Sequence, residues 1–169
     1  MAHLLLRHRD IPDLHKIEVY REHGGYEGLR KALTEMAPQD VIGVLRSSGL
    51  RGRGGAGFPT GVKWSFIPKG PGDKYVVINT DESETGTFKD RELSEKNPHQ
   101  VIEGAIIAAY AIGAKTIYNY FRGEFMDAAY AMEEALREAY DAGFLGKNIL
   151  GTDFSCDFYC HYGAGAYIC

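Results

Sequence analysis

The chain has 169 residues, of which 44% are hydrophobic, so it is long enough to fold as one domain around a buried core. It carries 19 basic and 23 acidic residues, and this net charge of −4, without a basic stripe, argues against a nucleic-acid partner. No apolar run approaches the roughly 18 residues that a membrane span needs, and the apolar stretch near the N-terminus is too short for a signal peptide. We therefore expect a soluble protein that is made in the cytoplasm and does not insert into a membrane.

The first 50 residues predict an arm followed by two helices. Residues 1–25 have scattered charge and no sustained periodicity, apart from a possible short turn near residues 11–17, and this favours an extended N-terminal arm. From Tyr26 onward, apolar residues recur at helical spacing until Pro38. A second helix has Pro38 in its first turn and is expected to end near Gly49. These two helices should brace the segment that follows.

That segment, residues 52–64, reads G-R-G-G-A-G-F-P-T-G-V-K-W and is the strongest binding signal in the chain. Its five glycines in ten positions leave backbone N–H groups free to approach an anion. Arg53 and Lys63 bracket this bare backbone, and Phe58 and Phe66 supply aromatic rings beside it. A guanidinium and an ammonium next to exposed amides suit a phosphate or pyrophosphate. The segment therefore predicts a cradle for a nucleotide phosphate.

The spelling also fits the dinucleotide fingerprint G-x-G-x-x-G at Gly52, Gly54 and Gly57. That fingerprint has meaning only where it follows a strand and opens a helix. The sequence predicts neither, because residues 41–48 have helical spacing and Pro59 follows the glycines. We therefore expect a binding mode unlike a standard Rossmann first turn. A glycine-rich stretch alone is more often a flexible turn, and here the cations and aromatic residues favour binding.

Residues 74–80, K-Y-V-V-I-N-T, form a β-branched run typical of a strand buried on both faces of a parallel sheet. The run ends in a polar cluster that contains Asn79, Asp81, Glu82, Ser83 and Glu84. Ligands of open α/β sheets bind beyond the carboxyl ends of strands, so the cluster stands where a site is expected. An ordinary acidic surface loop is the alternative. Beside the glycine-rich cradle, carboxylates and amides that hold the hydroxyls of a ribityl or ribose chain are favoured.

The rest of the chain alternates helix and strand. The predicted elements are a polar helix at 88–97, a buried helix at 99–111, a strand at 115–121, an amphipathic helix at 124–142, a strand at 154–161 and a small-residue turn at 163–169. This order predicts an α/β fold with a parallel, Rossmann-like sheet. His99 is interpreted as part of its helix's first turn rather than as a catalytic base.

Three cysteines, Cys156, Cys160 and Cys169, lie within the last fourteen residues. An odd, clustered set without a secretory signal argues against a disulfide framework. The spacing is weak for a metal site, so we interpret the cysteines as buried or half-buried thiols on a strand.

Four blocks of sequence together resemble one protein family. They are G-L-R-G-R-G-G-A-G-F-P-T-G-V-K-W-S-F at 49–66, N-T-D-E-S-E-T-G-T-F-K-D-R at 79–91, L-G-K-N with G-T-D-F at 145–154, and G-A-G-A-Y-I-C at 163–169. In order and spacing, they closely resemble the NADH-binding flavoprotein subunit of respiratory complex I, an NADH:quinone oxidoreductase. The resemblance extends from about Tyr26 to Cys169.

The resemblance implies that residues 26–169 form an FMN- and NADH-binding Rossmann-like domain behind the arm at 1–25. NADH would stack on the isoalloxazine and pass a hydride to FMN, after which electrons leave singly toward iron–sulfur clusters and quinone. The cofactor carries this chemistry, and no protein base is required. The implied FMN contacts are Gly52, Arg53, Gly54, Gly55, Lys63, Asn79, Asp81, Glu82, Ser83 and Tyr167. The implied NADH contacts are Phe58, Phe66 and Glu84, with Glu84 near the nicotinamide.

The chain also departs from the family pattern. Thr80 and Thr85 stand where relatives often have Ala and Pro, which should affect only loop stiffness. In the family, the last block continues into Gly-Glu-Glu, and a distal C-x-x-C-type motif ligates a [4Fe-4S] cluster. Neither is present here, and three clustered cysteines cannot replace four ligands. We therefore expect an N-terminal portion of the subunit, without cluster ligands and with an FMN pocket that is incomplete toward the C-terminus.

The resemblance further implies a [2Fe-2S] subunit and a large iron–sulfur subunit as partners. The implied location is peripheral, on the cytoplasmic face of the inner membrane, or on the matrix side in a mitochondrion. Two alternatives remain open. One is the equivalent flavoprotein module of an NAD-linked hydrogenase or formate dehydrogenase, and the other is a truncated fragment that binds partners without turning over substrate.

Overall fold

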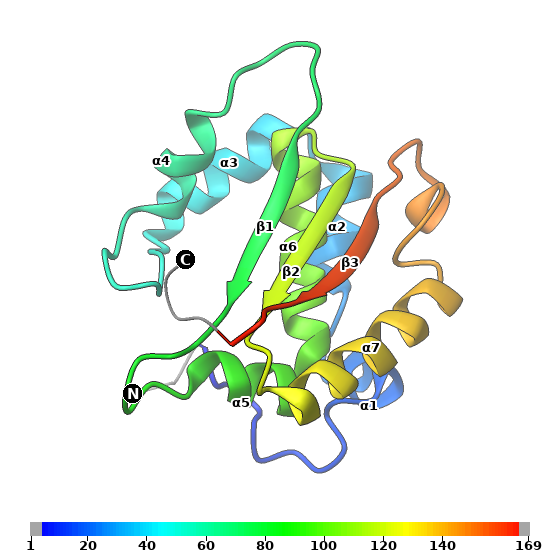
Figure 1. The fold of residues 1–169 in the computed structure, drawn as a ribbon. Coiled ribbons are helices and arrows are strands. Elements are labelled where there is room, and N and C mark those ends of the chain that lie inside the picture. Colours follow the sequence, from blue (N-terminus) through cyan, green and yellow to red (C-terminus); the bar gives the residue numbers. More distant parts are fainter. Residues whose placement is uncertain (1–4, 166–169) are drawn as a thin grey trace.

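The computed structural model describes residues 5–165 and shows helices packed against one face of a parallel sheet (Figure 1). The strands are β1 (Tyr75–Thr80), β2 (Thr116–Phe121) and β3 (Asp157–Tyr162), in the order β1-β2-β3. Both strand pairs are parallel, and the register aligns Val77, Tyr118 and Tyr159 in one row. The α/β fold with a parallel sheet that the sequence predicts is confirmed.

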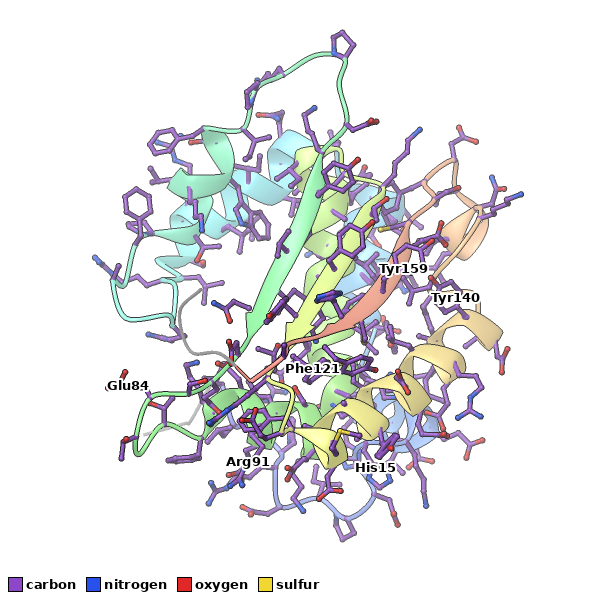
Figure 2. The ribbon with its side chains drawn as sticks, in the orientation of Figure 1. His15, Glu84, Arg91, Phe121, Tyr140 and Tyr159 are labelled. Atoms are coloured by element: carbon purple, nitrogen blue, oxygen red, sulfur yellow. The ribbon has the colours of Figure 1, made fainter. Side chains whose placement is uncertain are left out.

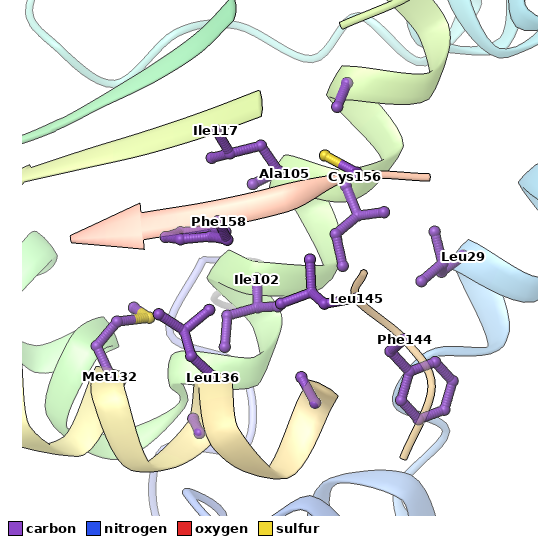
Figure 3. Packing of buried hydrophobic residues seen from close by; sticks show 14 of the residues in the cluster. Leu29, Ile102, Ala105, Ile117, Met132, Leu136, Phe144, Leu145, Cys156 and Phe158 are labelled. Carbon is purple, nitrogen blue, oxygen red and sulfur yellow. The ribbon is translucent and has the colours of Figure 1, made fainter. Parts of the chain in front are cut away.

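Two long helices connect the strands: α6 (Pro98–Ile112) follows β1, and α7 (Met126–Asp141) follows β2. Each crossover between parallel strands is right-handed as a rule, so strands added in one direction place their helices on the same face. The main core lies between this face and the two helices (Figure 3). Ile117 and Phe158 of the sheet share it with Ile102 of α6 and with Met132 and Leu136 of α7. The amphipathic helix predicted at 124–142 is confirmed as α7, whose apolar face packs into this core.

The opposite face of the sheet is open to solvent in the described part of the chain. Tyr75 and Val77 of β1 are 53% and 68% exposed, so the prediction that this strand is buried on both faces is wrong. A continuous β-branched run does not distinguish a strand covered on both faces from one covered on a single face. On the open face, Tyr118 lies between Tyr75 and Tyr159, with ring centroids 6.1 Å and 5.7 Å away.

The predicted helices before and after the glycine-rich segment are observed. They are α2 (Glu27–Glu35), α3 (Pro38–Ser48) and α5 (Lys89–Lys96). Pro38 occupies the first turn of α3, and Gly49 ends it with a φ of 69°, a value that glycine adopts without strain. A short helix that the sequence did not predict, α4 (Thr60–Ser65), starts directly after Pro59. The glycines therefore do open a helix, although a helix and not a strand precedes them.

The segment before Tyr26 is not extended throughout. It contains α1 (Ile17–Glu22), and Leu14 and Tyr20 belong to the main core. The boundary between an arm at 1–25 and a domain at 26–169 stays a prediction. A 3₁₀ turn, η1 (Ile149–Gly151), precedes β3. None of the helices between residues 5 and 165 has the length and apolar character that crossing a bilayer requires.

Buried polar side chains hold the N-terminal helices against the core. The carboxylate of Glu103 accepts hydrogen bonds from the Tyr20 hydroxyl and from the backbone N–H groups of Tyr26 (2.9 Å) and Leu29 (3.0 Å), at the start of α2. Burial raises the pKa of the Tyr20 and Tyr26 hydroxyls, and the Glu103 charge adds to the rise. Charge-assisted hydrogen bonds of this kind offset the cost of burying a carboxylate.

His99 lies in the first turn of α6, as predicted, and its side chain is fully buried. Its Nε2 lies 3.1 Å from the Glu138 carboxylate of α7, and its Nδ1 lies 2.8 Å from the Tyr26 hydroxyl. Burial lowers the pKa of the imidazole, and the nearby Glu138 charge opposes the shift. This histidine therefore links α2, α6 and α7 as a neutral hydrogen-bonding group.

Candidate functional site

The glycine-rich segment is a loop whose two ends are joined by backbone hydrogen bonds. The backbone N–H of Gly52 donates to the carbonyl of Phe58 (2.9 Å), and the N–H of Thr60 donates to the carbonyl of Leu50 (2.9 Å). Within the loop, Gly55 and Gly57 have φ values of 113° and 62°, which other residues rarely adopt. A methyl group added at either glycine would meet nothing within 4 Å. The loop therefore presents bare backbone to open space.

Gly61 serves a different purpose from the other glycines of this segment. A Cβ placed there would lie 2.5 Å from the backbone nitrogen of Arg46. The absence of a side chain thus allows α4 to pack backbone to backbone on α3. The sequence pattern alone does not separate this packing glycine from the glycines that face solvent.

The polar cluster after β1 is held in a defined turn. The Asn79 side-chain carbonyl accepts a hydrogen bond from the backbone N–H of Asp81 (2.9 Å), and the Ser83 hydroxyl donates to the Asp81 carboxylate (2.9 Å). Glu84 follows on the exposed side of this loop (Figure 2). The two predicted halves of the site thus have separate local supports, one in each loop.

One cavity of about 970 Å³ brings the two halves together. Its lining contains eight of the predicted site residues: Arg53, Gly54, Gly55, Asn79, Asp81, Glu82, Ser83 and Glu84. This volume is near the upper end of the range typical of small-molecule sites. The cavity lies beyond the carboxyl end of β1, which is where the position of the polar cluster indicated a site.

Three further residues line this cavity and were not predicted as site residues from the sequence: Thr87, which precedes α5, and Lys89 and Asp90 in its first turn. The Lys89 ammonium pairs with the Asp90 carboxylate and lies 3.6 Å from that of Glu82. Burial raises the pKa of Asp90, while the Lys89 charge opposes the rise. The available signal was Lys89 itself, a basic residue shortly after three carboxylates in the block at 79–91.

The other predicted site residues do not line the cavity. Gly52 lies where hydrogen bonds join the two ends of the loop. Lys63 belongs to α4, and its side chain is exposed. Phe58 and Phe66 are 46% and 68% exposed, and their ring centroids lie 6.2 Å apart with planes tilted by 56°. They form a separate aromatic pair beside the loop. Tyr167 lies outside the described residues.

The cysteines have the surroundings expected of structural thiols. Cys156 is buried just before β3, and Cys160 is half-buried within it. Burial raises the pKa of both thiols to about 12. Both residues are therefore protonated at neutral pH, as the interpretation of these two as buried thiols requires. Cys169 lies outside the described residues.

The lining of the cavity suits two parts of a flavin mononucleotide, its phosphate and its ribityl chain. The bare amides of Gly54 and Gly55 with the Arg53 guanidinium suit a phosphate, because they combine backbone donors with a fixed charge. Asn79, Asp81 and Ser83 offer acceptors and donors for the hydroxyls of a ribityl chain. The residues present therefore fit the phosphate and ribityl parts of FMN.

The chain is similar in sequence to known proteins over most of its length. The family described as "Nuo51 FMN-binding domain" matches residues 45–169. The chain is 54% identical over 167 residues to an NADH-quinone oxidoreductase subunit of Rhizobium meliloti, covering 98% of this chain and 40% of the relative. It is 48% identical over 155 residues to the corresponding NADH-quinone oxidoreductase subunit of Escherichia coli, covering 90% of this chain and 35% of the relative.

Among solved structures, the NAD⁺-reducing [NiFe]-hydrogenase in the H₂-reduced state superposes with a TM-score of 0.67 and 36% identity. The match covers 77% of this chain and 22% of the hydrogenase chain. The chain thus spans about 40% of the length of the curated relatives it matches.

Proposed function

Because the chain belongs to the Nuo51 FMN-binding domain family, we propose that it is the flavin-binding part of the flavoprotein subunit of an NADH:quinone oxidoreductase. The observation that carries the proposal is the cavity in which the glycine loop faces the polar end of β1. When bound, FMN would accept a hydride from NADH and release electrons one at a time. The protein groups would bind and orient the two nucleotides.

In this proposal, Arg53, Gly54 and Gly55 hold the FMN phosphate, and Lys63 adds positive charge from α4. Asn79, Asp81 and Ser83 hold the ribityl chain and the flavin edge. Support comes from the way the cavity lining divides into a cationic, amide-rich side and a polar side. Fixing the flavin matters because a near-attack geometry can lower the barrier of hydride transfer by about 7–11 kcal/mol.

NADH is proposed to use the aromatic pair Phe58 and Phe66 for its adenine and to place its nicotinamide near Glu84. The two rings are already neighbours on the exposed side of the glycine loop. Their tilt means that at least one ring would have to turn for a flat base to stack between them. Tyr167 is proposed to complete the flavin pocket.

The wider assignments follow from the family and belong to the same proposal. The electrons would pass to iron–sulfur clusters, including a [4Fe-4S] cluster of the full-length subunit, and then to quinone. The partners would be the [2Fe-2S] subunit and the large iron–sulfur subunit of a complex that is peripheral on the cytoplasmic face of the membrane. Support for this assembly comes from the curated relatives, which are named as subunits of NADH-quinone oxidoreductase.

A second candidate function is the flavoprotein module of an NAD-linked hydrogenase. The observation in its favour is the TM-score of 0.67 with the NAD⁺-reducing [NiFe]-hydrogenase. Sequence identity favours the quinone-linked enzyme, with 54% to the Rhizobium relative against 36% to the hydrogenase. Purifying the chain's native complex and testing it for hydrogen-dependent against quinone-dependent NAD(H) chemistry distinguishes the two.

The direct test of the flavin site is a fluorescence-quenching titration of the 169-residue chain with FMN and with riboflavin, which lacks the phosphate. The Arg53→Ala change should weaken FMN binding about 10- to 100-fold, because a hydrogen bond to a charged group contributes about 1.5–3 kcal/mol. Riboflavin binding should change little. Lys63→Ala should weaken FMN binding much more than Lys147→Ala, a control that removes an exposed lysine on the loop before β3.

Three outcomes would contradict the proposal. A folded wild-type chain that quenches no flavin fluorescence would mean that the glycine loop and the polar end of β1 do not form a flavin site by themselves. Equal affinity for FMN and riboflavin would mean that the glycine loop does not hold the phosphate. Equal effects of Lys63→Ala and Lys147→Ala would remove Lys63 from the cradle and leave Arg53 as its cation.

A further inference from the structure

The side chain of Glu82 differs from its acidic neighbours because it is buried. Its side chain is 1% exposed, whereas Glu84, two residues later, is exposed. The resemblance places Glu82 in a flavin-contacting segment, but burial at the base of the loop leaves little of its carboxylate available to a ligand. Its hydrogen bonds show what it does instead.

Both carboxylate oxygens of Glu82 accept hydrogen bonds from the first turn of α5. Oε1 accepts from the backbone N–H of Asp90 (2.9 Å), and Oε2 accepts from that of Arg91 (3.1 Å). The ammonium of Lys89 lies 3.6 Å from Oε1. The carboxylate therefore caps the helix and satisfies N–H groups that have no partner within it.

The backbone of Glu82 makes a third connection. Its carbonyl accepts a hydrogen bond from the guanidinium of Arg122 (3.3 Å), in the loop that follows β2. The backbone N–H of Arg122 in turn donates to the carbonyl of Thr80 (3.3 Å). One residue thus joins the loop after β1, the start of α5 and the loop after β2.

These connections bear on the cavity, because α5 forms its wall. Lys89 and Asp90 in the first turn of α5 line one side, together with Thr87 just before the helix. Arg53, Gly54 and Gly55 line the glycine-loop side. A helix N-terminus with free N–H groups attracts anions. Because the Glu82 carboxylate already binds the N–H groups at the start of α5, a second anion is disfavoured there.

We propose that Glu82 is a positioning residue whose carboxylate fixes the start of α5, which forms one wall of the cavity. Because this carboxylate occupies the N-terminus of α5, the ligand's phosphate binds at the glycine loop instead. The inference rests on the proposed function, which identifies the ligand as FMN. In this inference, Glu82 acts by holding α5 in place and not by contacting the flavin. The isosteric change Glu82→Gln tests it, because an amide offers one acceptor oxygen where the carboxylate offers two. One α5 N–H group then faces an NH₂ group and loses its partner.

The chain supplies a matched control in Glu103. This buried carboxylate also accepts two backbone N–H groups at a helix start, those of Tyr26 and Leu29 at α2, and it does not line the cavity. Glu103→Gln should therefore lower the stability of the fold in the same way, by removing an acceptor for an N–H group at a helix start, and should leave the cavity unchanged. The comparison separates positioning of the cavity wall from a general loss of stability.

The first measurement is hydrogen exchange on the unliganded chains. In Glu82→Gln, the amides at residues 89–92 should exchange about tenfold faster than in the wild type, while those at 26–30 keep their rate. Glu103→Gln should show the opposite pattern. Unchanged exchange at 89–92 in Glu82→Gln would overturn the proposal whether or not the chain binds flavin.

The second measurement is flavin affinity in the same variants. Glu82→Gln should lower the affinities for FMN and for riboflavin by about tenfold each. The ratio of FMN affinity to riboflavin affinity should therefore fall less in Glu82→Gln than in Arg53→Ala. Glu103→Gln should bind both flavins as the wild type does. Wild-type FMN affinity in Glu82→Gln, with a loss of thermal stability like that of Glu103→Gln, would make the role merely structural and overturn the inference.

Two further results keep the inference separate from the proposed function. A wild-type chain that binds no flavin would mean that these residues do not form a flavin site by themselves, and the exchange pattern still decides whether Glu82 fixes α5. If Glu82→Gln does not fold, Arg122→Ala replaces it, because this change removes the side-chain link to the Glu82 carbonyl. Faster exchange at residues 81–83 is expected in Arg122→Ala, and unchanged exchange there would count against the three-way connection.

Discussion

The contact between α3 and α4 depends on a single missing methyl group, at Gly61. In the Gly61→Ala variant, the new Cβ would lie 2.5 Å from the backbone nitrogen of Arg46, 2.7 Å from its Cγ and 2.9 Å from its Cα. Two of these three atoms belong to the backbone of α3, which cannot rotate away as a side chain does. The two helices must therefore separate to accommodate the substitution.

Such overpacking costs about 1–3 kcal/mol. Because Lys63 lies on α4, the displacement also moves this cation relative to the glycine loop. For a chain of this length, each kcal/mol lowers the melting temperature by about 2–4 °C. We therefore expect Gly61→Ala to melt a few degrees below the wild type and to bind FMN more weakly.

The control is Gly43→Ala, in the middle of α3. Gly43 is an exposed residue of this helix, and a Cβ there meets nothing within 4 Å. Alanine inside a helix is about 0.5–1 kcal/mol more favourable than glycine, so this variant should gain stability. Urea unfolding of both variants measures the difference. If Gly61→Ala is as stable as the wild type, the close approach of α3 and α4 is incorrect.

Two other predictions concern groups that do not line the cavity. The buried thiol of Cys156 and the half-buried thiol of Cys160 each have a pKa raised to about 12. At about pH 8, both should therefore react with iodoacetamide at least about tenfold more slowly in the folded chain than in urea, as peptide mass spectrometry can measure. Equal rates would contradict the shielding of these two thiols. The buried imidazole of His99 has a pKa lowered from 6.5, so its proton binds more tightly in the unfolded chain. Stability should hold above pH 6.5 and fall as the pH drops toward the lower folded pKa. Urea titrations at about pH 7.5 and about pH 5.5 should show a smaller loss in His99→Gln, and an equal loss would assign the pH dependence to other groups.

Local sequence signals located most elements of this fold. Pro38 and Gly49 bounded α3 because each has a backbone preference that suits one end of a helix. The inward face of α7 followed from the spacing of its apolar residues. These features depend on residues that are a few positions apart, so they can be predicted from the sequence alone.

The missed features depend on residues that are distant in sequence. Whether one or both faces of β1 are covered depends on where later segments of the chain pack, and the β-branched run within residues 75–80 does not record it. Glu103 contacts Tyr20, 83 positions away, so α1 could not be placed in the core from its own weak periodicity. The same limit applied at the site, where the acidic cluster was identified and the capping role of Glu82 was not.

The chain has one tryptophan, and the structure places it at a useful point. Trp64 is half-buried on α4, next to Lys63, and packs against a small apolar cluster that contains Val41 and Ile42 of α3. Its indole is therefore a built-in optical reporter for the junction between the two helices. Its emission should move to longer wavelength if α4 lifts from α3, with no label attached to the protein.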